Sequence, residues 1–292
     1  MSPCLDILRR AVTGPTTTGK NHPVFLHVAY TAPHWALHAP DDEIAKYRGR
    51  YAGGWQPVRE ARFECQMNMG MFPSHTTLSN QEPGVPAWHK VEATKEMDLR
   101  MATHAAMVHL VDRGVGRIVS KLNELEQLDN TLILFLSDNG TSAESGPTGL
   151  TGARGGDPKA RTGTPDSYNG FEIAGANMCD TPFRKYKMFV HEGGVATPLI
   201  THWPTGIPAK LNGHFSHELG HVIDLLPTCA DVAGATYPQI FEGRAVTPAL
   251  VHLQLSQTAC VCCGKMTICN EKSTGTKRGP VTAIATMMTL VA

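Results

Sequence analysis

The chain has 292 residues, 26 Lys and Arg against 26 Asp and Glu, and 41% hydrophobic residues. This length and apolar share exclude a disordered polyelectrolyte and suffice for one large or two ordinary globular domains. Because the net charge is zero and the pI is about 7.2, the chain lacks the basic field that holds phosphate backbones, so we expect no nucleic-acid partner.

The N-terminal part of the chain predicts one strand and the start of one helix. The opening letters MSPCLDILRR lack a basic segment followed by an apolar stretch, so we expect no signal peptide and leave the localisation open. Residues 23–30, PVFLHVAY, form a short apolar run that predicts a buried strand. His34 therefore follows a strand end, and Asp41-Asp42 is expected to cap a helix N-terminus.

A long helix and a second strand follow. From Lys95 to Gln127 apolar residues recur at steps of three and four, which predicts a helix weakened by Gly114 and Gly116 in its middle. Residues 131–140, TLILFLSDNG, contain the continuous apolar run of a strand that is covered on both faces. The order strand, long helix, strand predicts an α/β fold with a mostly parallel sheet.

In the second half of the chain, a segment without apolar periodicity precedes segments that predict a strand and a helix. Residues 141–180 show no sustained period, which predicts a long loop. Residues 195–203 predict another strand, and residues 217–233 a helix with a turn boundary or kink at Pro227.

The C-terminal tail carries an apolar run and a cluster of Cys residues. The last apolar run, residues 281–292, is twelve residues long, short of the roughly twenty that span a bilayer, so we expect no transmembrane segment. Four of the eight Cys lie in Cys260–Cys269. Their spacing lacks paired C-x2-C motifs, so we assign no zinc site.

Four residues are the candidates for chemistry. Asp138 and Asn139 supply oxygen donors of the kind that calcium or magnesium prefers, at the strand end where ligand sites of α/β sheets lie. The alternative is that Asn139 and Gly140 only form a tight turn. His34 could serve as a proton donor and Lys187 as a cation for an anionic group, although a structural His and a solvated Lys are the commoner cases.

Four segments of the chain closely resemble the sulfatase family, especially bacterial arylsulfatases. They are AYTAPHW at 29–35, LDNTLILFLSDNG at 128–140, DTPFRKYKMFVHEGGVATPLITHWP at 180–204 and GHVIDLLPTCADVAGATYP at 220–238. The resemblance runs from about residue 22 to about residue 250, and the four segments occur in the family's order.

The resemblance implies a fold and a set of roles. The fold would be the alkaline-phosphatase-like three-layer α/β sandwich, and the activity would be the hydrolysis of a sulfuric ester on a small molecule or a carbohydrate. Asp138 and Asn139 match the pair that ligates a divalent cation, generally calcium. His34 matches the His at the sulfate and leaving oxygen, and Lys187 the Lys that grips the sulfate. Relatives are usually periplasmic or secreted.

One family motif is missing from the chain. The family nucleophile is a formylglycine made from Cys or Ser in C/S-x-P/A-x-R, and no Cys or Ser here has Arg four positions later. We therefore expect a partial sulfatase domain at 22–250 without a nucleophile, between a divergent segment at 1–21 and a Cys-rich tail at 251–292. A truncated or frameshifted gene product with impaired activity is the expectation.

Two other functions stay open. A phosphomonoester or phosphodiester hydrolase of the same superfamily would use a Thr or Ser nucleophile, which the chain does not show either. A catalytically inert remnant or anion-binding protein is the alternative from a different class. The oligomeric state and the identity of the sulfate ester are left open.

Overall fold

The computed structural model describes residues 3–13, 23–143, 156–247 and 282–288, which fall into two compact units. Unit 1 is drawn from residues 1–29, 116–136 and 198–287. Unit 2 is drawn from residues 30–115, 137–197 and 288–292. The long helix α4 (Thr94–Glu124) begins in unit 2 and ends in unit 1.

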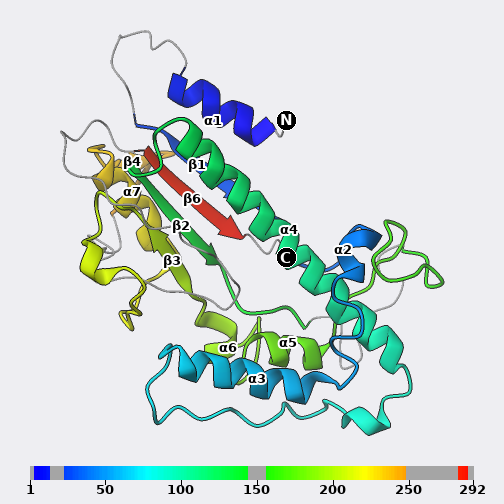
Figure 1. Cartoon of the computed structure of the whole chain (residues 1–292). Coiled ribbons are helices and arrows are strands. Elements are labelled where there is room, and N and C mark those ends of the chain that lie inside the picture. The colour runs from blue at the N-terminus through cyan, green and yellow to red at the C-terminus, as the bar shows by residue number, and fades with distance from the viewer. Residues whose placement is uncertain (1–2, 14–22, 144–155, 248–281, 289–292) are drawn as a thin grey trace. The chain divides into compact units, whose positions relative to one another are not determined.

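Unit 1 contains a four-stranded sheet in the order β1-β6-β2-β3 (Figure 1). The strands are β1 (Phe25–Ala29), β2 (Thr131–Ser137), β3 (Leu199–His202) and β6 (Thr282–Met288). β1 pairs with β6 in parallel, whereas β2 pairs with β3 antiparallel. The arrows of β6 and β2 point the same way in Figure 1. The sheet is therefore mixed, and the expected parallel order holds for three of its strands.

The strand β2 is buried on both faces, as its unbroken apolar text predicts. Leu132 and Leu134 pack with Cys229 on one face. On the other face Ile133 packs with Leu8 of helix α1 (Pro3–Thr13) and with residues of α4. The strand ends at Ser137, and Asp138 follows it in the chain.

The C-terminal helix of unit 1 is shorter than the predicted 217–233. A 3-10 turn, η4 (Val222–Asp224), precedes α7 (Leu225–Val232). The His221 side chain accepts from Ile223 N, while Asp224 accepts from His221 N, so a capping box starts the helix here. Pro227 lies in the first turn of α7, where a missing N–H costs no helical bond. Residues 217–221 are not helical.

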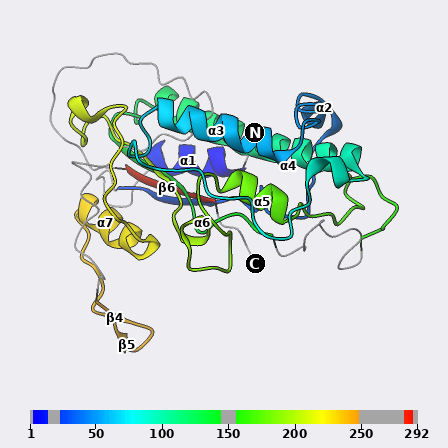
Figure 2. The ribbon, with the colours of Figure 1, turned by 90° about the horizontal axis from the view of Figure 1, so that it is seen from below.

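Two smaller elements complete unit 1. A 3-10 turn, η3 (Ala209–Leu211), follows β3. The hairpin of β4 (Ile240–Phe241) and β5 (Arg244–Ala245) projects from α7 (Figure 2). Both residues of β4 are exposed apolar side chains.

Unit 2 is helical around its own core. It contains α2 (Asp41–Ala45), α3 (Trp55–Asn68), η1 (Trp88–Lys90), α5 (Ile173–Cys179), α6 (Glu192–Val195) and the first part of α4. The helices α3 and α5 lie side by side (Figures 1 and 2). The main cluster of buried residues comprises Leu37, Trp55, Met97, Met101, Met107, Phe171, Ala174 and Met178.

Two sequence-based expectations for unit 2 need correction, and one of its helices was not predicted. The segment 141–180 is not loop throughout, because its end forms α5. Residues 174–178 of this helix are all buried, so it shows no amphipathic period. The helix α3 was not expected either, since its text is polar and its buried side chains include Arg59 and Gln66. Asp41 and Asp42 lie inside the first turn of α2 and do not cap it, because the N-cap residue is Pro40.

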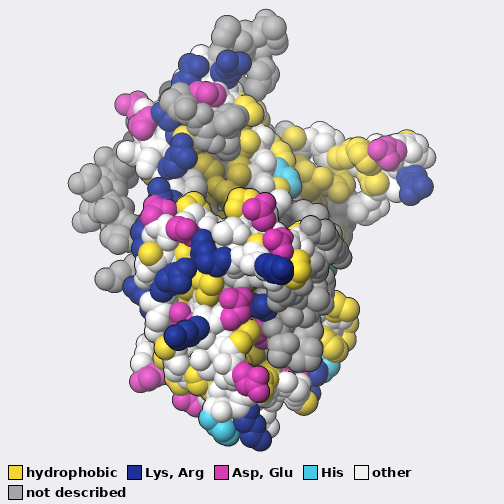
Figure 3. All heavy atoms as spheres, turned by 90° about the vertical axis from the view of Figure 1, so that its right-hand side faces the viewer, with side chains coloured by type: hydrophobic (Ala, Val, Ile, Leu, Met, Phe, Trp, Pro, Cys, Tyr) yellow, Lys and Arg dark blue, Asp and Glu magenta, His cyan; other side chains and the backbone are white. Residues whose placement is uncertain are grey.

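The helix α4, the Cys cluster, the absence of a membrane-spanning helix and the surface charge were also predicted from the sequence. The predicted helix 95–127 is confirmed as α4, with its end three residues earlier. The Cys cluster at 260–269 lies outside the described residues. None of the helices in the described ranges is long and apolar enough to cross a membrane. In the face shown in Figure 3, dark-blue basic side chains lie among magenta acidic ones, as a net charge of zero leads one to expect.

Candidate functional site

His34 lies in a turn just after β1. Its backbone N–H donates to Thr31 O at 3.0 Å, and its Nδ1 lies 2.6 Å from Trp35 O. A carbonyl oxygen can only accept, so Nδ1 carries a proton and Nε2 is the ring nitrogen left to face outward. The imidazole stacks on the Trp35 ring with centroids 5.8 Å apart. These contacts fix the ring and aim Nε2 at a neighbouring segment.

Lys187 reaches His34 from a segment 153 positions further along the chain. Its Nζ lies 3.5 Å from His34 Nε2. Its backbone N–H donates to Thr141 O at 3.1 Å, directly after the Asp138–Gly140 segment, which we call the DNG loop. The structure therefore brings the two predicted catalytic residues together and joins Lys187 to the loop that carries the predicted metal ligands.

The glycines of the HEGG turn (His191–Gly194) and the DNG loop explain why these segments pack so closely. A Cβ on Gly140 would lie 1.8 Å from Gly193 O, and one on Gly194 would lie 2.0 Å from Phe189 O. Gly140 N donates to Gly194 O at 3.0 Å, so the two backbones touch directly. Only glycine fits such an approach, and this contact places the two motifs side by side.

Asp138 and Asn139 follow the last residue of β2. The Ser137 hydroxyl donates to Asn139 O at 3.0 Å, and Thr197 Oγ1 donates to Ser137 O at 2.7 Å. The simple turn alternative is wrong, because Gly140 N pairs with Gly194 O and Gly140 lacks the positive φ that a type I′ hairpin turn needs. The loop is a strand end held by the HEGG turn.

Asn139 offers an oxygen that suits a cation. Its Oδ1 is buried and accepts no hydrogen bond from the described residues, which is costly unless another partner is present. Within the same ranges, no group of three or more His, Cys, Asp or Glu residues is placed to hold a metal ion. Asp138 and Asn139 would thus supply two of the six to eight oxygens in a calcium shell.

Sequence reasoning missed the residue that anchors the DNG loop. Both carboxylate oxygens of Asp180 accept from Thr141 N at 3.1 Å, and Oδ1 also accepts from the Thr141 hydroxyl at 2.7 Å. Burial raises the pKa of Asp180 to about 7, against the opposing effect of the Thr141 hydrogen bonds. Asp180 begins the DTPFRKYK motif, and this position is the one sequence signal that could have indicated a role for it. The motif does not indicate that Thr141 is its hydrogen-bond partner.

All four predicted site residues belong to unit 2. Comparisons with known proteins show to which family the chain belongs. A model of the sulfatase family matches residues 7–235. The chain belongs to the sulfatase family. The match begins before residue 22 and ends before residue 250, whereas the division into 1–21, 22–250 and 251–292 stays a prediction.

The relatives carry sulfatase names but are longer. An uncharacterized sulfatase of Schizosaccharomyces pombe is 33% identical over 239 residues, which is 78% of this chain and 42% of that protein. An arylsulfatase of Klebsiella aerogenes is 28% identical, covering 80% of this chain and 51% of its own length. The N-acetylgalactosamine-6-sulfatase of Canis lupus familiaris is 33% identical over 51% of this chain and 23% of its own length. The chain thus spans about half the length of the first two relatives.

Among solved structures, the crystal structure of Ps i-CgsB in complex with k-i-k-neocarrahexaose is similar to this chain. It is 29% identical, with a TM-score of 0.43, and the match covers 80% of this chain and 33% of that one.

Proposed function

We propose that this chain binds a sulfuric ester at His34 and Lys187, as part of a sulfatase site that hydrolyses the ester. The observation that supports the proposal is the 3.5 Å approach of Lys187 Nζ to His34 Nε2 beside the DNG loop. A cation and an imidazole that meet across 153 positions form a site for an anion with a leaving oxygen.

In this proposal each residue has a separate task. The Lys187 ammonium neutralises charge on the sulfuryl oxygens. As a water molecule forms the new bond to sulfur and the S–O bond to the alcohol breaks, the doubly protonated His34 ring would give its Nε2 proton to the alcohol oxygen, and the attacking water would return a proton. Nδ1 stays bonded to Trp35 O throughout. A divalent cation, which we expect to be calcium, would draw further charge from the sulfuryl group, and Asp138 with Asn139 would hold it.

Full turnover needs a nucleophile that the 292 residues do not show, since no Cys or Ser fits the C/S-x-P/A-x-R pattern. Without a covalent nucleophile, hydrolases retain only the catalysis that binding and electrostatics supply. We therefore propose impaired hydrolysis, and a sulfate-ester binder without turnover is the second candidate. A phosphate-ester hydrolase has less support, because the relatives are named sulfatases.

The substrate would be a sulfate ester of an aryl or sugar alcohol. This follows the names of the relatives, an arylsulfatase and an N-acetylgalactosamine-6-sulfatase. An open hollow of about 470 Å³ lies at the HEGG turn, but its lining includes none of the four site residues, so it carries no argument about the substrate.

Binding and turnover can be measured on the same protein. The purified 292-residue chain is titrated with inorganic sulfate and assayed with 4-nitrophenyl sulfate in the presence of calcium. His34→Ala and Lys187→Met should each weaken sulfate binding about tenfold or more, as expected for a lost charged hydrogen bond. His75→Ala and Lys90→Met, two exposed residues of unit 2, serve as matched controls. Equal affinity in all five proteins would refute the site.

A further inference from the structure

The segment that carries His34 is held by a loop from much further along the chain. We call residues 34–39 the His34 segment. Three hydrogen bonds join it to loop 157–172: Leu37 N to Asn169 O at 2.9 Å, His38 Nε2 to Ser167 O at 2.6 Å, and Ala39 N to Gly163 O at 3.3 Å. The Tyr168 ring also meets the Trp35 ring edge-on, with centroids 5.4 Å apart. The position of His34 thus depends on where this loop lies.

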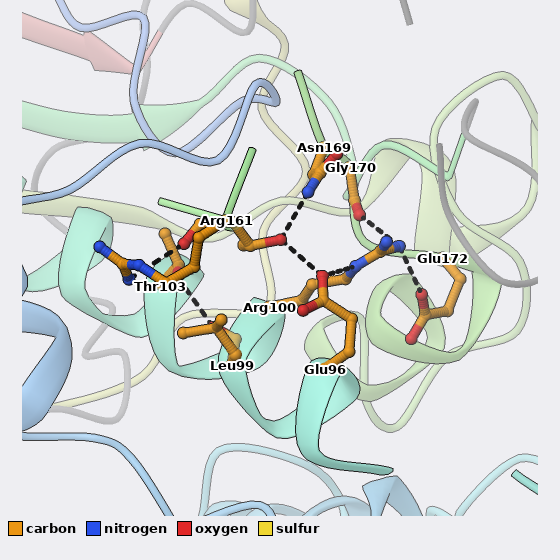
Figure 4. A network of polar contacts seen from close by, with 9 residues as sticks. Glu96, Leu99, Arg100, Thr103, Arg161, Asn169, Gly170 and Glu172 are labelled. Carbon is orange, nitrogen blue, oxygen red and sulfur yellow. Dashed lines mark hydrogen bonds and ion pairs between the residues drawn. The ribbon is translucent and has the colours of Figure 1, made fainter. Parts of the chain in front are cut away.

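The loop is held in turn by two charged residues of α4 (Figure 4). Thr162 Oγ1 donates to Glu96 Oε1 at 2.6 Å, and the same carboxylate oxygen accepts from Arg100 Nε at 2.9 Å. Arg100 Nη1 donates to Gly170 O at 3.2 Å. Asn169 Nδ2 donates to Thr162 Oγ1 at 2.6 Å. The Thr162 hydroxyl therefore links Glu96 of α4 to Asn169, whose carbonyl oxygen accepts from Leu37 N.

Three of the side chains in this network are closed to water, whereas Glu96 is partly exposed. Thr162 is 1% exposed, Asn169 2% and Arg100 3%. A buried donor that loses its acceptor stays unsatisfied or moves to find another one. Removal of the Thr162 hydroxyl would leave Asn169 Nδ2 without this acceptor and Glu96 without this donor, so the loop would shift at the point where it holds Leu37.

We propose that Thr162 is a positioning residue for His34. Its hydroxyl, between Glu96 and Asn169, fixes loop 157–172 on α4, and the loop fixes the distance between His34 Nε2 and Lys187 Nζ. The consequence for binding rests on the proposed roles of His34 and Lys187, whereas the consequence for the position of the His34 segment does not.

The chain offers a close control for the test. Thr103 is fully buried on α4, and its hydroxyl donates to Leu99 O at 2.8 Å within that helix. Thr162→Val and Thr103→Val both remove a buried hydroxyl, but only the first breaks the link to the loop. Thr162→Ser keeps the hydroxyl and should behave as the wild type.

The first measurement is amide hydrogen exchange of Leu37 in the full chain. We expect Thr162→Val to speed this exchange about tenfold relative to Thr103→Val, because local opening depends on the bonds that hold the segment. Thr162→Ser should exchange at the wild-type rate. Equal rates in Thr162→Val and Thr103→Val would overturn the proposal, whatever the chain binds.

The second measurement is titration with inorganic sulfate. We expect Thr162→Val to raise the Kd about fivefold, since a small misplacement of a binding group is costly, with Thr103→Val and Thr162→Ser close to the wild type. If His34→Ala weakens binding but Thr162→Val matches Thr103→Val, the positioning role is wrong and the sulfate site stands. If His34→Ala and Lys187→Met bind sulfate as the wild type does, the proposed function fails, and with it the claim that Thr162 acts on binding.

Discussion

At the scale of single residues, Glu172 is a carboxyl group buried at the start of α5. It is 1% exposed, and both of its carboxylate oxygens lack a hydrogen bond from the described residues. Burial raises its pKa to about 7, while Arg100, whose Nη1 lies 3.8 Å away, opposes the shift and Glu96 adds to it. Arg100 thus lies close to two carboxyl groups, and the raised pKa of Glu172 favours its protonated form below about pH 7.

This shift predicts a fall in stability as the pH rises. Between the ordinary value of 4.5 and about 7, the folded chain holds the Glu172 proton while the unfolded chain has released it. The stabilisation is complete below pH 4.5 and is lost by pH 7, and it amounts to about 3 kcal/mol at most. Glu172→Gln mimics the protonated group and should remove this fall.

The measurement is the free energy of unfolding in urea at pH 5 and pH 8. Glu172→Gln should be more stable than the wild type at pH 8 and similar at pH 5. The comparison between the two proteins matters because burial also lowers the pKa of His104, to about 4, which gives a slope of opposite sign in both. An identical pH dependence in wild type and variant would show that Glu172 is not protonated.

Asp138 and Asn139 predict a weak calcium effect. Two oxygen donors give low affinity, so millimolar calcium should raise the melting temperature by about 1–2 °C through preferential binding to the folded chain. Asn139→Ala and Asp138→Asn should abolish this shift. Asp112→Asn, on the exposed side of α4, should keep it. A shift that survives in Asn139→Ala would place the cation elsewhere.

At the scale of elements, α4 shows how far sequence periodicity leads. Its extent follows from the apolar spacing, and β2 follows from its unbroken apolar run. The helices α3 and α5 do not, because α3 buries polar residues such as Arg59 and α5 is buried along its whole middle. Apolar periodicity predicts a helix with one solvent-exposed face and one buried face. It does not predict helices that are buried all round or that bury polar side chains.

The two glycines of α4 give a prediction at this scale. A Cβ on Gly116 would meet nothing within 4 Å, whereas one on Gly114 would lie 2.4 Å from the Tyr30 hydroxyl. Gly116→Ala should therefore stabilise the chain by about 1 kcal/mol, the ordinary gain in helix propensity. Gly114→Ala should lose that gain or destabilise, because Tyr30 must move. Unfolding in urea distinguishes the two, and equal stabilisation by both would contradict the contact with Tyr30.

At the scale of the whole molecule, the residues of the candidate site could be predicted from the sequence, because each lies in a short continuous motif. The order of the strands in the sheet could not be predicted. The strand β6 comes from the tail that the sequence left unassigned, yet it lies between β1 and β2. Sheet order depends on pairings between distant segments, which periodicity does not report. The antiparallel pairing of β2 with β3 escaped prediction for the same reason.

The position of β6 predicts that the tail stabilises unit 1. In β6, Ala285 pairs with His27 of β1. Because β6 has neighbours on both sides, Ala285→Pro would remove a ladder hydrogen bond from a central strand. We expect a lower melting temperature and association at higher concentration, since unpaired strand edges attract one another. Ala285→Val keeps the backbone N–H and should melt at a higher temperature than Ala285→Pro. Equal melting temperatures for the two variants would contradict the strand order.

His34 and Lys187 together are proposed to bind the tetrahedral sulfuryl group of a sulfate ester, for which the selenate ion is a probe. The most direct test is a crystal structure of the chain grown with selenate, whose anomalous signal locates the anion. We expect selenate within hydrogen-bond distance of both Lys187 Nζ and His34 Nε2, next to the DNG loop. Selenate bound elsewhere, or the two side chains far apart, would contradict it.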